Sequence, residues 1–137
     1  MFLNNTYISS GLKMNNTNRL LKVAYIVGGL PYGGVETWLL DVAKNAPSYR
    51  IEPIIINISG KGKLQDKFLK NNITIYNIGQ SYKCINTYRI DTLLKLFFTI
   101  RKINPDIIHT AHFSADYFGR LANITIKKPI FTHLRNI

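Results

Sequence analysis

Two kinds of hydrophobic pattern alternate along the chain. Short apolar runs rich in β-branched residues are typical of strands buried on both faces of a parallel sheet, whereas apolar residues spaced three and four apart indicate a helix with one buried face. The first such run, LLKVAYIV at Leu20–Val27, ends at Gly28 and Gly29. It predicts a buried strand followed by a tight turn.

The sequence GGLPYGG comes next, and a helical pattern follows it until Pro47. The apolar face of this helix would consist of Val35, Trp38, Leu39, Val42 and Ala43. The alternation then continues to the end of the chain. It predicts strands at Arg50–Ser59, Ile73–Ile78, Asp106–His109 and Pro129–Leu134, and helices at Leu64–Lys70, Ile90–Ile103 and Ala115–Asn123. In the helix at Ile90–Ile103, the residues expected to face the core are Ile90, Leu93, Leu94 and Phe97.

Five strands that alternate with four helices predict an α/β fold, a Rossmann-like doubly wound parallel sheet with helices on both faces. Right-handed crossovers give the strand order 3-2-1-4-5. Ligands of such sheets bind at the carboxyl ends of the strands where the winding reverses, here between strands 1 and 4. We therefore expect a site between the loop GGLPYGG and the segment HTAHFSAD.

The length of 137 residues suits one compact domain. Residues 1–18 are rich in Asn, Ser and Thr and are expected to form a disordered tail, so the domain would span 19–137. Hydrophobic residues make up 46%, yet no stretch approaches the roughly 18 uninterrupted apolar residues of a membrane span. We expect a globular protein without an export signal, and the single cysteine, Cys84, agrees with a reducing cytoplasm.

Eighteen Lys and Arg residues against seven Asp and Glu residues give a formal net charge of +11. Such a charge attracts polyanions, anionic lipid and phosphorylated ligands. The basic residues are spread from Lys13 to Arg135 without a basic stripe on one helix or a nucleic-acid motif, which argues against DNA and RNA as partners. We expect a cytoplasmic protein that works on phosphorylated sugars, with a peripheral position at the anionic inner face of the membrane as an option.

Gly33 and Gly34 immediately precede the first predicted helix. Small residues there leave the first helical N–H groups open to an anion such as phosphate, although glycines also serve any strand-to-helix turn. The loop matches neither GxxxxGK[ST] nor GxGxxG, and Asn57 stands where a dinucleotide-binding fold has an acidic residue. A dinucleotide oxidoreductase is therefore disfavoured. Glu36, in the first helical turn, is expected to complement the helix dipole.

Two histidines, His109 and His112, lie at and just after the end of the fourth strand. This position favours a functional role for His109, while His112 is the weaker candidate. Arg135 and Asn136 follow the last strand, together with His133, at the same edge of the sheet, and could reach a ligand. The histidines lack the convergent partners of a metal site, and no GxSxG motif follows a strand, so metal binding and serine hydrolase chemistry are not expected.

Taken together, GGLPYGGVETWLLDVAK, NPDIIHTAHFSADYFGRLAN and THLRN resemble the N-terminal domain of family 4 retaining glycosyltransferases of the GT-B architecture. The resemblance covers Leu20 to Ile137. It implies a first Rossmann-like domain that receives the acceptor, facing a second domain that binds a nucleotide-diphosphate sugar. The family transfers the sugar with retention of configuration and without a metal cofactor, to a glycan or a lipid-linked acceptor.

The resemblance also assigns roles to residues of this chain. Gly33 and Gly34 match the glycine loop that approaches the donor phosphates, and His109 matches the histidine that ends strand 4. Family members often carry a second histidine two positions later, where this chain has Ala111, and His112 stands one place further on. His109 is thus the predicted catalytic residue, and Gly33, Gly34, His112, Arg135 and Asn136 are predicted to bind substrate.

The paired-glutamate motif of the donor-binding domain is not found in the sequence, so we expect that the donor domain lies outside this chain and that the chain alone is inactive. A split enzyme, or a fragment of one, is one interpretation. The other is a stand-alone Rossmann-like module that binds a phosphorylated or acidic ligand without catalysis. A flavodoxin-like or response-regulator-like domain is weaker, because a phosphoacceptor aspartate after a strand is missing.

Overall fold

The computed structural model describes residues 18–60, 62–79 and 89–133. The predicted tail at 1–18 falls almost wholly outside these ranges, as do Cys84, Arg135 and Asn136. The described part folds as one parallel sheet with the strand order β3-β2-β1-β4-β5, which confirms the predicted topology. The strands are β1 (Leu21–Val27), β2 (Ile51–Asn57), β3 (Thr74–Asn77), β4 (Ile107–Ala111) and β5 (Ile130–His133).

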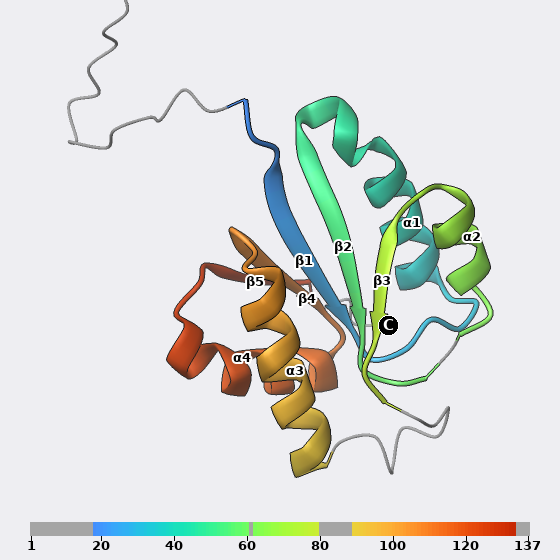
Figure 1. Cartoon of the computed structure of the whole chain (residues 1–137). Coiled ribbons are helices and arrows are strands. Elements are labelled where there is room, and N and C mark those ends of the chain that lie inside the picture. The colour runs from blue at the N-terminus through green and yellow to red at the C-terminus, as the bar shows by residue number, and fades with distance from the viewer. Residues whose placement is uncertain (1–17, 61, 80–88, 134–137) are drawn as a thin grey trace, which may run out of the picture.

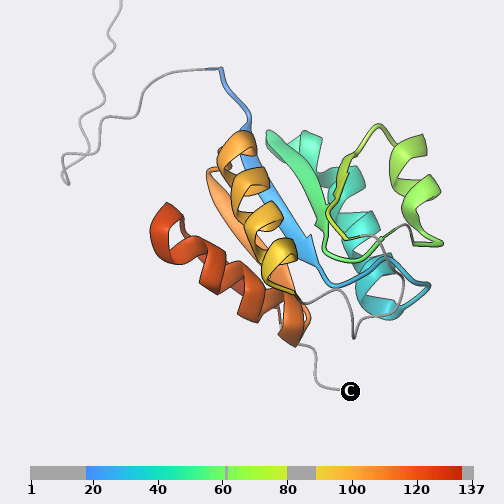
Figure 2. The ribbon, with the colours of Figure 1, turned by 60° about the horizontal axis from the view of Figure 1, so that its bottom comes forward.

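Helices cover both faces of this sheet (Figures 1 and 2). They are α1 (Gly34–Asn45), α2 (Gln65–Lys70), α3 (Ile90–Ile103) and α4 (Phe113–Ile126), with a short 3₁₀ helix, η1 (Ala46–Tyr49), after α1. Helices α1 and α2 lie on one face, and α3 and α4 lie on the other. The fold is therefore the Rossmann-like three-layer arrangement that the sequence predicts.

The sheet carries one hydrophobic core on each face, because successive strand residues point to opposite sides. In β1, Ala24 and Ile26 pack with Leu96 of α3 and Phe118 of α4. The alternate residues of β1 pack on the α1 and α2 side. Strand β1 is thus buried on both faces, as its continuous apolar run predicts. No described helix is both long enough and apolar enough to span a bilayer.

Two boundaries near the predicted crevice differ from expectation. Strand β4 continues past His109 to Ala111, and α4 begins at Phe113 instead of Ala115. The end of β4 is fixed by its neighbours in the sheet, because Ala111 is paired with Val27 of β1 on one side and with His133 of β5 on the other. The polar residues of HTAH did not indicate this strand end. His109 consequently lies inside the strand, and His112 is the residue that follows it.

The predicted inner face of α3 is wrong for two of its four residues. Leu93 and Phe97 pack against the core, but Ile90 and Leu94 are exposed. The buried side of the helix is formed by Thr92, Leu96, Ile100 and Ile103. Because α3 carries apolar residues on both its inner and its outer side, three-and-four spacing alone could not identify the buried side.

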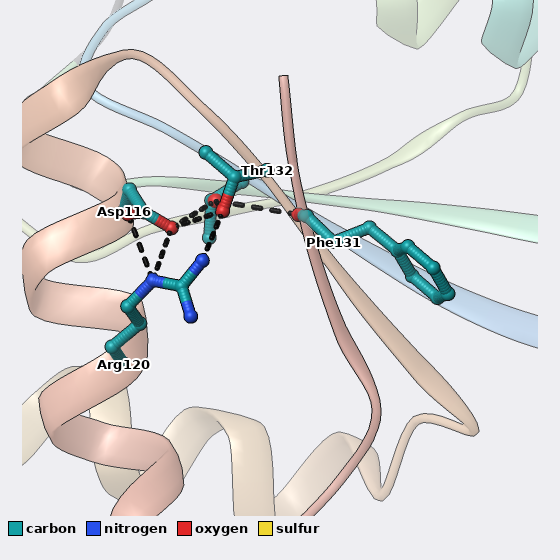
Figure 3. A network of polar contacts seen from close by, with 5 residues as sticks. Asp116, Arg120, Phe131 and Thr132 are labelled. Carbon is teal, nitrogen blue, oxygen red and sulfur yellow. Dashed lines mark hydrogen bonds and ion pairs between the residues drawn. The ribbon is translucent and has the colours of Figure 1, made fainter. Parts of the chain in front are cut away.

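A polar network joins α4 to the sheet (Figure 3). Asp116 accepts hydrogen bonds from Thr110 of β4 at 2.8 Å, from Thr132 of β5, and from Nε of Arg120 at 2.9 Å. Arg120 also donates to Thr132 at 2.7 Å, so the guanidinium and the carboxylate hold the same hydroxyl. Arg120 is thus paired with a carboxylate, and the network fixes α4 against β4 and β5.

Helix α4 approaches the sheet closely at Gly119. A Cβ atom at that position would lie 2.8 Å from Cγ2 of Thr110, closer than Cβ contacts normally are. The glycine is needed there for space and not for an unusual backbone conformation. The close approach lets the short side chain of Asp116 reach both threonines.

Replacing Asp116 with Asn should lower the free energy of unfolding at neutral pH by about 1–3 kcal/mol, because it removes a charged acceptor from a partly buried network. Burial opposes ionisation of Asp116, but hydrogen bonds from Thr132, Arg120 and Thr110 and the charge of Arg120 hold its pKa below the usual value. The stabilisation is thus present above an unfolded-state pKa of about 3.9 and is lost as the pH falls through the lower folded-state pKa.

Chemical denaturation at neutral and at acidic pH measures this effect. The matched control is Asp91→Asn, which removes an exposed carboxylate paired with Arg89 at 3.4 Å and should change stability by less than about 0.5 kcal/mol. Equal losses in the two variants would contradict a special role for the network.

Candidate functional site

The candidate site lies where β1 and β4 end side by side. The last residue of β1, Val27, is paired with the last residue of β4, Ala111. The chain leaves β1 toward α1 on one face of the sheet and leaves β4 toward α4 on the other. The amino-terminal ends of two helices therefore meet at this edge, which is the switch point where open α/β sheets bind ligands.

Gly33 and Gly34 form the start of α1. Gly33 is the N-cap residue in an extended conformation, and the first helical hydrogen bond runs from the N–H of Thr37 to the Gly33 carbonyl at 3.0 Å. The N–H groups of Gly34, Val35 and Glu36 precede that bond and are left without partners within the helix. These groups, at the positive end of the helix dipole, are suited to an anion.

The side chain of Glu36 is an unexpected part of this loop. It is only 3% exposed, and its Oε1 lies 3.2 Å from Nε2 of His112. The carboxylate folds back over Gly33 so closely that a Cβ atom on Gly33 would lie 2.3 Å from Glu36 Oε2. A side chain at position 33 would therefore displace the Glu36 carboxylate, a consequence that the sequence pattern did not reveal.

His112 connects the two loops of the switch point. It is the N-cap of α4, and its carbonyl accepts the N–H of Asp116 at 3.0 Å. Its backbone has φ 81° and ψ 147°, a conformation that costs a residue with a side chain of the order of 1–3 kcal/mol. This backbone places the half-exposed imidazole against Glu36, so the Glu36–His112 contact bridges the β1–α1 and β4–α4 loops.

The sequence indicated a ligand-binding role for His112 only weakly, and it predicted that Glu36 complements the helix dipole. One sequence signal could have predicted the contact between these two residues. Glu36 stands at the third helical position after the N-cap Gly33, where an acidic side chain commonly folds back over the helix start. The residue that follows the neighbouring strand then lies within its reach, and here that residue is His112.

His109 has a different environment from the one expected. Its ring lies on the α1 face of the sheet, 5.2 Å from the ring of Tyr25 and 6.1 Å from that of Trp38. Its Nε2 atom is buried and has no hydrogen-bond partner among the described residues. Burial, and then the nearby charge of His133, lower the pKa of His109, so the neutral form of the ring is favoured.

The ring of Trp38 links His109 to the last strand. It stacks on His133 with centroids 4.6 Å apart and an angle of 11° between the planes. His109 and His133 are themselves 6.4 Å apart. The structure thus places His133 next to the predicted catalytic histidine, whereas Arg135 and Asn136, which follow it, lie outside the described residues.

The carboxyl end of β2 is occupied by a structural network. Asn57 is fully buried, its amide donates to the Gly60 carbonyl at 2.5 Å and to Asn77 at 2.9 Å, and its carbonyl accepts from Ser59 at 3.0 Å. These bonds hold the loop after β2 in place. Asn57 is therefore engaged within the protein.

Metal ligands do not gather at the switch point. Across the described residues, no three His, Cys, Asp or Glu side chains are grouped closely enough to hold a metal ion. The polar groups at this edge are instead helix N–H groups, one carboxylate and imidazole rings. Such a set can hold an anionic group and donate hydrogen bonds to it.

No protein-family model matches the chain, and no curated protein matches its sequence. Solved structures do match. A glycosyltransferase from Rickettsia africae ESF-5 is 23% identical with a TM-score of 0.63, over 86% of this chain and 31% of that one. HepE of Anabaena, whose structure holds UDP and glucose, is 20% identical with a TM-score of 0.67, over 85% and 30%.

A third match comes from a different class of protein. The C-terminal domain of the PF1911 hydrogenase from Pyrococcus furiosus is 10% identical with a TM-score of 0.61, over 85% of this chain and 92% of that domain. Identities this low establish the fold alone. The chain spans about a third of the length of the two larger proteins, so its fold corresponds to one domain of each.

Glu36 and His112 are expected to be energetically coupled. In a double-mutant cycle with Glu36→Gln and His112→Gln, we expect a coupling energy of about 0.5–3 kcal/mol, because the two side chains are in contact at 3.2 Å. Chemical denaturation of the four proteins measures it. Gly33→Ala should abolish most of the coupling, because the added methyl displaces the carboxylate. Additive effects in the cycle would contradict the pairing.

The buried imidazole of His109 is expected to lower the free energy of unfolding. Replacing it with Phe removes a buried nitrogen without a hydrogen bond and keeps an aromatic ring, so the free energy of unfolding should stay the same or rise by about 1 kcal/mol. Because the folded-state pKa of His109 is lowered, wild-type stability should fall as the pH drops through the unfolded-state value of about 6.5, and this dependence should weaken in His109→Phe. Denaturation curves from about pH 8 to about pH 5 test both points, and a destabilised variant with an unchanged pH dependence would refute them.

Proposed function

We propose that this chain is the acceptor-side, N-terminal domain of a glycosyltransferase that moves a sugar from a nucleotide-diphosphate sugar to a glycan or lipid-linked acceptor, with retention of configuration. The observation that carries the proposal is the switch-point site. There the amino terminus of α1, opened by Gly33 and Gly34, lies beside a buried Glu36 that contacts His112. Fold similarity to a glycosyltransferase and to a protein holding UDP and glucose supports it.

The residues of this chain would act on the departing diphosphate. As the bond between the sugar and the diphosphate breaks, negative charge grows on the diphosphate oxygens, and preorganised N–H donors stabilise it. The first N–H groups of α1 are such donors. Nε2 of His112 is engaged by Glu36, which fixes the ring, and the other ring nitrogen can then meet the ligand. This scheme needs no metal cofactor.

His109 remains the predicted catalytic residue. Its ring lies between Tyr25 and Trp38 on the α1 face, so a role in the reaction requires the acceptor to reach that aromatic cluster. The neutral imidazole would then offer the unpartnered Nε2 to an acceptor hydroxyl. Arg135 and Asn136, which follow β5, are proposed to extend the substrate contacts at the same edge.

A stand-alone module that binds a phosphorylated ligand without catalysis is the second candidate. The hydrogenase domain favours it, because the same fold there makes up 92% of a domain of another class of protein. The two candidates differ in whether a second domain is needed. We also propose a cytoplasmic protein that is peripheral at the membrane.

The proposed transfer needs a donor-binding domain as well as this one, so residues 1–137 tested by themselves should not turn over nucleotide sugars, and a separately supplied donor-binding domain should allow turnover. In the restored enzyme, Gly34→Val should lower turnover about 100-fold or more, because a branched side chain blocks anion approach to the α1 N–H groups. His109→Ala should lower turnover if the ring contacts substrate, but only the melting temperature if the ring is purely structural.

Radiolabelled sugar transfer and thermal unfolding, measured on the same samples, separate these outcomes. Ser48→Val, an exposed substitution on η1 away from the switch point, is the control and should change neither. Turnover by the chain alone would overturn the proposed division of the site. Binding of inorganic diphosphate by the chain, lost in Gly34→Val but without transfer in any pairing, would favour the second candidate.

A further inference from the structure

A pocket of about 380 Å³ lies on the α1 face of the sheet, at the carboxyl-terminal end of α1. Tyr25 of β1 and Ile51 of β2 line its sheet side, and residues from the end of α1 and from η1 line the other side. A helix rises about 1.5 Å per residue, so Asn45 at the end of α1 lies about 16 Å from Gly34 at its start. The pocket is therefore separate from the anion site at the start of the helix.

The buried side of this pocket carries a hydroxyl without a partner. Tyr25 is 6% exposed, and its hydroxyl makes no hydrogen bond to a described residue. Among the described residues, Nε2 of His109 is the one fully enclosed side-chain atom that lacks such a bond, so the Tyr25 oxygen is reached from the pocket. Burial raises the pKa of Tyr25, so the neutral hydroxyl can donate as well as accept. A ligand that bonds to it would satisfy a polar group that the fold leaves unpaired.

Two hydrogen-bond acceptors on α1 line the same pocket. The side-chain amide of Asn45 donates to the Asp41 carbonyl at 2.8 Å, and no described residue donates to the side-chain oxygen of Asn45. The Asp41 carboxylate likewise has no cationic partner among the described residues, although the chain carries eighteen Lys and Arg residues. Acceptors that no protein group engages favour a ligand that donates hydrogen bonds.

An aromatic ring stands on the solvent side of the pocket. Tyr49, the last residue of η1, lines the pocket and is 77% exposed. Val42 and Ile51 add apolar surface to the lining. An exposed ring beside apolar side chains and a few polar groups suits a ligand that has one apolar face and several hydrogen-bonding groups.

Two kinds of ligand have these properties. One is a sugar ring, whose C–H face can stack on an aromatic side chain while its hydroxyls donate hydrogen bonds. The other is an ammonium ion, which a carboxylate and aromatic rings attract. The surrounding charge favours the sugar, because exposed Lys44 and Arg50 lie next in sequence to pocket residues and the chain has a net charge of +11. That positive field repels a cation and leaves a neutral ring unaffected.

We propose that this pocket binds one neutral pyranose ring of a glycan, with the C–H face of the ring on Tyr49. The sugar hydroxyls bond to Tyr25 at the buried end of the pocket and to Asp41 and Asn45 at its solvent side. The bound sugar is held away from the switch point and does not react. This inference goes beyond the proposed transfer reaction and does not depend on it, because Asp41, Asn45 and Tyr49 take no part in that reaction.

The test titrates the isotope-labelled full chain with the methyl glycosides of glucose, galactose and mannose and follows its backbone amide signals by NMR. At least one glycoside should shift the signals of residues 41–49, with a Kd on the order of 1 mM. Tyr25→Phe should weaken this binding about fivefold, because it removes one hydrogen bond and keeps the ring that contacts His109. Tyr76→Phe, which removes a hydroxyl on the other face of the sheet, is the matched control and should leave binding unchanged.

The stacking ring and the carboxylate are tested separately. Tyr49→Ala should weaken glycoside binding about fivefold or more, whereas Tyr117→Ala, which removes an exposed ring from α4, should not weaken it. Asp41→Asn should weaken binding about fivefold, and Asp66→Asn on α2 is its control. These four side chains are exposed, and the Tyr25 hydroxyl has no internal partner, so none of the corresponding substitutions should lower the melting temperature.

Several results would overturn the proposal. They are the absence of signal changes with all three glycosides, and binding that survives both Tyr25→Phe and Tyr49→Ala. Tighter binding of tetramethylammonium than of any glycoside, lost in Asp41→Asn, would show an ammonium site instead. Loss of glycoside binding in Gly34→Val but not in Tyr49→Ala would place the sugar at the switch point. Since none of these measurements involves sugar transfer, failure here leaves the proposed function standing, and the reverse also holds.

Discussion

The parallel pairing of β1 with β4 is the contact on which the candidate site depends. It joins strands that are far apart in sequence, since the paired residues Val23 and Ile107 are 84 positions apart, and it reverses the direction in which the chain winds across the sheet. Because Val27 and Ala111 end the two strands together, the loops that follow them must lie side by side. Gly33, Glu36 and His112 meet only because of this register.

Burial of Glu36 sets a second constraint. A carboxylate that is 3% exposed loses most of its hydration. Its protein surroundings must therefore replace the hydrogen bonds to water and supply positive charge. The start of α1 supplies the positive end of a helix dipole, and His112 supplies a ring nitrogen at 3.2 Å. The unusual backbone of His112 is then understandable, since an ordinary helix N-cap conformation would aim the ring elsewhere. Two locally unfavourable features, a buried acid and a strained histidine, thus stabilise each other.

The sequence predicted the element order, the strand order and the adjacency of β1 and β4, because those follow from apolar periodicity and from the handedness of crossovers. It could not predict details that depend on neighbours in space. The end of β4 is fixed by pairing with β1 and β5, and the polar residues of HTAH gave no sign of it. The inner side of α3 was ambiguous because Ile90 and Leu94 are apolar without being buried. Glu36 was assigned to the helix dipole because its partner comes from a loop far away in sequence.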